Sequence, residues 1–154
     1  MNKKLYIISL LLFCAPLFVF AQNTTIKEAY VYASCATLDL HTNEIIEQMD
    51  GVHGVIMFTT DGENDIFVLS IGGDIVYGGT VSLVREGLRE GNISSTTYLV
   101  LQEVQGQIVP LRIYKVFDSS HSSFIPKEFV VQTLHKDTYE VVQNMTFQNI
   151  SRTN

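Results

Sequence analysis

Three carboxylates alternate along the stretch FTTDGENDIF: Asp61, Glu63 and Asp65. Such oxygen ligands bind calcium when several of them fold round the ion, with a turn glycine after the third ligand and a bidentate carboxylate closing the loop. Here Gly62 lies between the first two acids, and Gly72 stands where the closing Glu of an EF-hand would be. Asp-Gly and Asn-Asp are also residues that tight turns favour. We therefore interpret the stretch as a hairpin turn and predict no metal-binding residues in the chain.

Cys35 is the second candidate for chemistry, because a thiolate beside a histidine base can act as a hydrolase nucleophile. The histidines of the chain are His41, His53, His121 and His135. None of them lies in a recognisable catalytic signature. The small residues on both sides of Cys35 are typical of a strand that buries its cysteine. A small Cys/His hydrolase therefore stays an alternative only, and we predict no catalytic residue.

The remaining motifs lack the spacing that their chemistry needs. Zinc-binding histidines on one helix or hairpin lie a few residues apart, whereas the gaps between the histidines here are 12, 68 and 14 residues. The serines around His121 are not part of a G-x-S-x-G nucleophile elbow. The segment GGDIVYGGT has neither the lysine of a P-loop nor the glycine spacing of a dinucleotide fold. We expect no cofactor.

The N-terminus has the pattern of a secretory signal peptide. Two lysines precede the apolar run Leu5–Phe20, and Val19 and Ala21 occupy the −3 and −1 positions of a small-residue cleavage site. The run is shorter than the roughly 20 residues that cross a bilayer, and Pro16 interrupts it. The sequence thus predicts cleavage after Ala21, a secreted or periplasmic protein and no stable membrane insertion after cleavage.

The mature chain, residues 22–154, is expected to be acidic. Loss of Lys3 and Lys4 with the leader lowers Lys plus Arg from 10 to 8 against 16 Asp plus Glu, which gives a formal net charge of −8. Without a Lys/Arg cluster, this charge argues against nucleic acids and anionic lipid surfaces as partners. The 133 residues that remain suffice for a single small globular domain. With one cysteine left, no intramolecular disulfide can form.

Apolar periodicity predicts strands that alternate with short helices. The strands are expected over residues 28–38, 52–60, 66–71, 97–104, 107–117 and 127–134. In the segment over 42–51, Ile45, Ile46 and Met49 have the spacing of one helix face, and Gly51 can end the helix. The segments over 80–90 and 138–148 fit either a weak helix or a strand: Asp137 and Glu140 have the spacing of a capping box, which favours a helix, whereas the alternation of the residues that follow suits a strand equally.

The expected fold class is therefore α+β, with antiparallel β-hairpins and two or three short helices. The order β, α, β, β, α, β over residues 28–104 matches a ferredoxin-like, split βαβ unit. Every strand is kept in an alternative in which the weak helices unwind. That alternative is an all-β meander or a lipocalin-like barrel.

Since each catalytic motif fails, we expect an exported, non-catalytic binding or interaction module of the bacterial envelope or extracellular space. Its partner, a protein or a glycan, is not defined by the sequence. Tyrosines at positions 30, 32, 98 and 114 are candidates for an exposed binding face. Two alternatives remain: the Cys35 hydrolase, and a carrier of a small apolar ligand, which requires the meander to close round a cavity.

Overall fold

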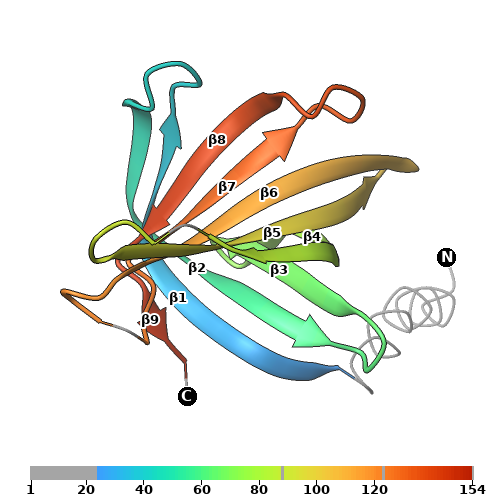
Figure 1. Cartoon of the computed structure of the whole chain (residues 1–154). Coiled ribbons are helices and arrows are strands. Elements are labelled where there is room, and N and C mark those ends of the chain that lie inside the picture. Colours follow the sequence, from blue (N-terminus) through green and yellow to red (C-terminus); the bar gives the residue numbers. More distant parts are fainter. Residues whose placement is uncertain (1–23, 88, 123, 154) are drawn as a thin grey trace, which may run out of the picture.

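The computed structural model describes residues 24–87, 89–122 and 124–153, and the regular elements in this part of the chain are all strands (Figure 1). In chain order they are β1 (Thr25–Leu38), β2 (Ile45–Thr60), β3 (Asp65–Ile71), β4 (Asp74–Glu86), β5 (Ile93–Val104), β6 (Gln107–Asp118), β7 (Glu128–Leu134), β8 (Val141–Gln148) and β9 (Ser151–Arg152). The predicted signal peptide, residues 1–21, lies outside the described residues. The described part contains no helix long and apolar enough to cross a membrane.

Sequential strands pair antiparallel from β1 to β8, and β1 pairs with both β2 and β8. The eight strands therefore close into a barrel, and the short β9 pairs with Tyr30 and Val31 in the middle of β1. We call the end of the barrel at which β1 begins the proximal end. The hairpins β1–β2, β3–β4, β5–β6 and β7–β8 all project at the opposite, distal end.

The predicted α+β class and its ferredoxin-like unit are wrong. No helix exists among the described residues, and the chain adopts the all-β alternative, a closed meander. The segments over 80–90 and 138–148 belong mainly to β4 and β8. Asp137 and Glu140, read as a capping box, instead lie in the turn that joins β7 to β8, where the backbone N–H of His135 donates to the carbonyl oxygen of Glu140 at 2.8 Å.

The helix predicted over 42–51 is the start of β2. Its isoleucines are β-branched and fit a strand as well as a helix, and pairing with β1 decides between the two. Gly51, expected to end the helix, has φ +73° and lies in a β-bulge. Tyr32 pairs with Gly54 and Ser34 with Asp50, so three residues of β2 lie opposite one residue of β1. The bulge bends β2 round the barrel.

Both predicted hairpin turns are present. Residues 61–64 join β2 to β3, with the Asp61 N–H donating to the Asn64 carbonyl oxygen at 3.2 Å. Gln105 and Gly106, both with positive φ, join β5 to β6. These turns depend on local sequence chemistry, which is why they were predictable.

The barrel interior is a packed aromatic and aliphatic core. Inward-facing side chains alternate with outward-facing ones along each strand, as in Leu111, Ile113 and Lys115 of β6. The largest fully buried side chains are Tyr30, Tyr32, Phe67, Phe129 and Phe147. The middle of the barrel therefore holds side chains, and open volume remains near its proximal end.

Candidate functional site

The three alternating carboxylates have separate structural roles. Asp61 Oδ1 accepts hydrogen bonds from the backbone N–H groups of Glu63 at 2.9 Å and Asn64 at 2.7 Å. The Asn64 bond, then the Glu63 bond, lowers the pKa of the Asp61 carboxyl below its usual value. Asp65 instead forms an ion pair with Lys27 at 2.6 Å. No group of three His, Cys, Asp or Glu side chains among the described residues is placed to hold a metal ion.

Cys35 lies in the core, where it pairs with Met49 of β2 and Phe147 of β8. No hydrogen bond joins it to a histidine in the described part of the chain. Burial, and to a smaller extent Glu47, raises the pKa of the Cys35 thiol above its ordinary value. A protonated, buried thiol is a poor nucleophile.

Cys35 is therefore expected to resist thiol reagents in the folded protein. The chain without residues 1–21, which holds one cysteine, should show almost no reaction with Ellman's reagent at pH 8 and one reacted thiol after unfolding in urea. Rapid, complete reaction of the folded protein would contradict the buried placement and revive the hydrolase alternative.

A serine, a histidine and an aspartate meet at the end of β6, but not as a catalytic triad. The Ser120 hydroxyl donates to Asp118 Oδ1 at 2.5 Å and lies 3.0 Å from His121 Nδ1. Asp118 Oδ2 lies 3.4 Å from the same ring nitrogen. In a triad the carboxylate and the serine use opposite nitrogens of the imidazole. The Ser120 bonds, first among the causes, lower the pKa of Asp118, and the cluster stabilises a turn.

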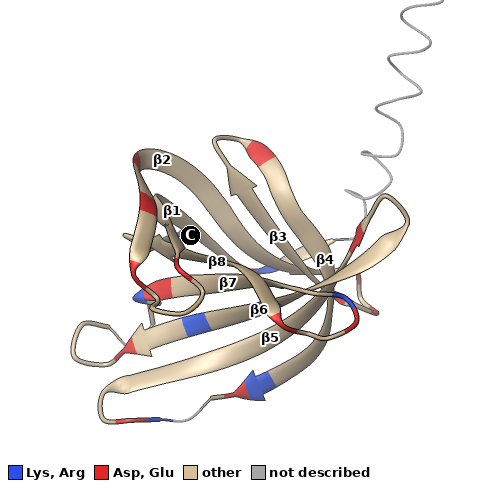
Figure 2. Cartoon of the chain, turned by 90° about the horizontal axis from the view of Figure 1, so that it is seen from above, with Lys and Arg blue, Asp and Glu red and all other residues tan. Residues whose placement is uncertain are grey.

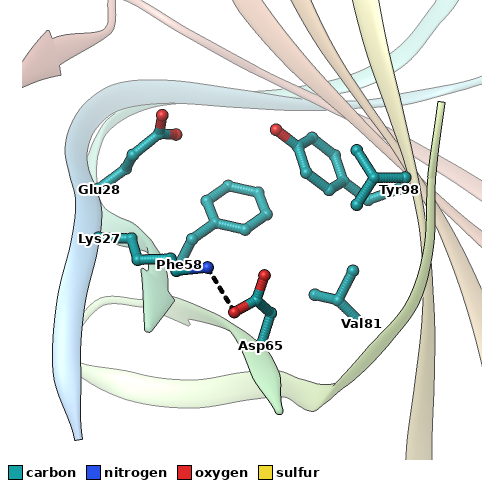
Figure 3. Close-up of a pocket in the computed structure, with 7 residues that line it drawn as sticks. Lys27, Glu28, Phe58, Asp65, Val81 and Tyr98 are labelled. Atoms are coloured by element: carbon teal, nitrogen blue, oxygen red, sulfur yellow. Dashed lines mark hydrogen bonds and ion pairs between the residues drawn. The ribbon is translucent and has the colours of Figure 1, made fainter. Parts of the chain in front are cut away.

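The most site-like feature is a pocket at the proximal end of the barrel, with a volume of about 290 Å³ (Figure 3). We call it the mouth pocket. Its apolar lining is Phe58, Val81, Val84 and Tyr98, and its charged lining is Lys27, Glu28 and Asp65. The rings of Phe58 and Tyr98 lie 4.6 Å apart between centroids and form one aromatic wall. Figure 3 shows the polar ends of Tyr98 and Glu28 pointing toward each other across this space.

Two β-bulges build the mouth pocket. Adjacent strand residues normally face opposite sides of a sheet, yet Lys27 and Glu28 both line the pocket. The register between β1 and β2 shifts between Ile26 and Glu28, and this irregularity turns both side chains the same way. A second shift, in β4, lets Val81 and Val84 share the pocket although they are three positions apart and would otherwise face opposite sides of the sheet.

The pocket also adjoins a hollow in the barrel wall. Pairing between β3 and β4 ends at Ile66 and Thr80, while β4 continues to Glu86 along β5 alone. The β3-facing edge of that segment is therefore free of strand pairing. The hollow along this edge shares Asp65, Val81 and Val84 with the mouth pocket. A ligand can thus approach from the side as well as from the end of the barrel.

Lys115 is a buried cation directly behind the pocket. Its side chain lies inside the barrel, 5% exposed, and its ammonium forms an ion pair with Glu28 Oε2. It also lies over three aromatic rings, 5.1 Å from the centroid of Tyr30, 5.4 Å from Phe117 and 5.9 Å from Phe58. Ring faces and the carboxylate together compensate the buried charge.

The phenols near this ion pair remain protonated at neutral pH. The Tyr30 hydroxyl donates to Glu28 Oε2 at 3.2 Å, and burial first, then the Glu28 charge, raises the pKa of Tyr30. Burial likewise raises the pKa of Tyr98, with Lys115 opposing and Glu28 assisting. Tyr98 therefore presents a neutral hydroxyl that can both donate and accept hydrogen bonds.

No protein-family model, curated protein or solved structure matches this chain. The chemistry of the mouth pocket must therefore be inferred from its own residues. Of the tyrosines predicted for an exposed face, Tyr30 and Tyr32 are core residues and Tyr98 lines the pocket.

The sequence did not predict most of the pocket because its residues come from five strands and depend on two bulges. The strand predicted over 28–38 begins at Glu28 and leaves Lys27 outside it, so nothing in the sequence pairs these two side chains. The sequence pattern does place Lys115 inside the barrel, because Lys115 continues the series of alternate, inward-facing residues Leu111 and Ile113 in β6. A lysine in an inward-facing series indicates a buried partner for its charge.

Proposed function

We propose that this protein binds and carries a small, mainly apolar ligand in the mouth pocket. The observation that supports this proposal is the position of the pocket. A closed barrel filled by side chains retains about 290 Å³ of open space at one end, beside an aromatic wall. Small-molecule sites range from about 300 to 1,000 Å³ and combine apolar walls with few polar groups. At about 290 Å³ the pocket lies just below this range, which favours a compact ligand.

Export remains part of the proposal. The signal-peptide pattern of residues 1–21 points to the periplasm or the medium as the compartment. A carrier there would meet ligands before they reach the cytoplasm.

A protein-interaction module is the second candidate, because the distal hairpins carry exposed apolar side chains. They are Leu40, Ile45, Ile46, Ile75, Val76, Val104, Ile108, Tyr139 and Val142. Exposed apolar surface can mark a docking site when it is contiguous. These side chains are divided among four separate hairpins, and carboxylates occur at the strand ends and loops (Figure 2). The small-ligand proposal is preferred because its pocket has a built aromatic wall.

Binding of a compact apolar probe should depend on the open volume of the mouth pocket. The neutral dye N-phenyl-1-naphthylamine is expected to bind with enhanced fluorescence, and Val84→Trp should weaken binding at least about tenfold, a loss of about 1.4 kcal/mol. Val84 is 50% exposed, so the larger side chain can occupy the pocket without strain in the core.

Val142→Trp is the matched control. Val142 is 52% exposed and lies on β8 at the distal end, so this variant should bind the dye as the parent does. Equal loss in both variants, or no binding by the parent, would contradict a ligand site at the mouth. Circular dichroism checks that both variants keep the barrel.

A further inference from the structure

The mouth pocket offers more hydrogen-bond acceptors than donors. Within the described residues, no hydrogen bond engages Glu28 Oε1, Asp65 Oδ2 or the Tyr98 hydroxyl. The three groups come from β1, β3 and β5 and line one pocket. Their oxygen atoms can accept hydrogen bonds from a ligand that carries several donors.

The cations near the pocket are already engaged. The Lys27 ammonium lies 2.6 Å from Asp65 Oδ1. Lys115 is buried behind Glu28 and bonds to the other oxygen of that carboxylate. An anionic ligand would therefore meet two carboxylates, and it could reach Lys115 only by displacing Glu28. Displacement would break the Glu28–Lys115 ion pair and bring the anionic ligand beside the like-charged carboxylate of Glu28, which is unfavourable.

The aromatic wall also favours a positive charge. Cations are attracted to the faces of aromatic rings, more strongly where water is excluded. Phe58 and Tyr98 line the pocket beside the free carboxylate oxygens, and the Phe58 ring already attracts one cation, the Lys115 ammonium, 5.9 Å from its centroid. The chain as a whole carries a formal net charge of −6, and this field raises the local concentration of cations.

We infer that the ligand is a compact apolar amine, whose ammonium group donates to Glu28, Asp65 and Tyr98 while its apolar body packs between Phe58 and the valines. This inference rests on the proposed function and adds the chemical class of the ligand. An ammonium supplies three N–H donors for the three acceptors. Hydrogen bonds to charged groups are stronger than neutral ones, which makes the head group the source of selectivity.

Three probes with one naphthalene body separate the charge from the apolar contact. They are 1-naphthylmethylamine, 1-naphthalenemethanol and 1-naphthoic acid, titrated by calorimetry at pH 7, where the amine is a cation and the acid an anion. The amine is expected to bind at least about tenfold more tightly than the alcohol, and the acid more weakly than both.

The two possible failures give different results. Equal or weaker binding of the amine relative to the alcohol, with both still lost in Val84→Trp, would overturn the amine class and leave the ligand site standing. Absence of binding by all three probes, or binding that Val84→Trp does not change, would overturn both proposals.

A pair of charge variants tests the same inference in opposite directions. Asp65→Asn removes a carboxylate and releases Lys27, so affinity for 1-naphthylmethylamine should fall about tenfold. Lys27→Gln removes the competing cation and should raise the affinity about threefold. Both residues are partly exposed, so folding should be little affected. Affinity for 1-naphthalenemethanol should change less than about twofold in both variants, and equal changes for amine and alcohol would contradict the assigned role of the charge.

Discussion

Gly54→Ala is expected to lower the free energy of unfolding by about 3 kcal/mol, at the upper end of what overpacking costs, because the added methyl group meets fixed backbone. A methyl group at this position would lie 2.1 Å from the Ser70 carbonyl oxygen and 2.3 Å from the Tyr32 hydroxyl. The first contact is with backbone, which cannot rotate away as a side chain can. Relief requires β2 and β3 to separate.

The close approach has a structural cause. Regular pairing between β2 and β3 ends at Ile56 and Leu69. Beyond that pair, the Tyr32 hydroxyl donates to the Ser70 carbonyl oxygen at 2.7 Å, and the Val55 N–H donates to Ser70 Oγ at 3.0 Å. Tyr32 thus crosses from β1 over the glycine to the backbone of β3. A side chain at position 54 would occupy the path of that crossing.

Gly78→Ala provides the comparison. The nearest atoms to a methyl at Gly78 are the Phe67 carbonyl oxygen at 3.8 Å and a side-chain carbon of Ile75 at 4.0 Å, which are ordinary contacts. This variant should be neutral or more stable by up to about 1 kcal/mol, because alanine restricts the unfolded chain. Urea unfolding followed by far-ultraviolet circular dichroism measures both. If the free energy of unfolding of Gly54→Ala lies within about 1 kcal/mol of the parent value, then β2, β3 and the Tyr32 side chain can move apart to accommodate the methyl group, which contradicts the prediction.

The parts of the fold that depend on contacts between residues close in the sequence were predictable, and the parts that depend on contacts between distant residues were not. The turn at residues 61–64 is specified by Asp61, whose side chain bonds to two backbone N–H groups within three residues. Barrel closure joins β1 to β8, so that Cys35 pairs with Phe147. No local pattern encodes such a pairing.

The predicted helices failed for a related reason. Ile45, Ile46 and Met49 satisfy a helical period over a short window, and the same residues satisfy a strand once β1 is beside them. Tertiary pairing overrides weak propensity. Residues that end helices, such as Gly51, also occur in bulges because both require positive φ.

The candidate site was less predictable than the fold. Lys27 and Glu28 are neighbours whose joint orientation results from a bulge, and Val81 and Val84 owe theirs to another. Bulge positions depend on how two strands match in length and twist round the barrel. Sequence alternation alone assigns such pairs to opposite faces.

The ion pair between Glu28 and Lys115 leads to an asymmetric prediction. Glu28→Ala is expected to lower the free energy of unfolding by about 2–3 kcal/mol, because removal of one partner leaves a buried charge uncompensated. Lys115 is 5% exposed, so water cannot replace the lost carboxylate. The substitution also removes the acceptor of the Tyr30 hydroxyl. The three aromatic rings around the ammonium remain and limit the loss.

Lys115→Met should cost less than about 1 kcal/mol, although it breaks the same ion pair. Methionine fills a similar volume among the rings of Tyr30, Phe58 and Phe117, where a flexible thioether packs well. The Glu28 side chain is 34% exposed, so its carboxylate can be hydrated when the lysine is absent. The protein therefore loses more stability when Lys115 is left without Glu28 than when Glu28 is left without Lys115.

The double variant Glu28→Ala/Lys115→Met tests whether Glu28→Ala costs more than Lys115→Met because it leaves the Lys115 ammonium unpaired in the core. If the cost of Glu28→Ala comes from the ammonium left in the core, removal of that ammonium should restore most of the lost stability, at least about 1 kcal/mol. Urea unfolding of the parent, both single variants and the double variant completes the cycle. Additive losses would assign the effect to packing at Glu28, and a Lys115→Met variant as unstable as Glu28→Ala would show that the barrel needs the charge itself.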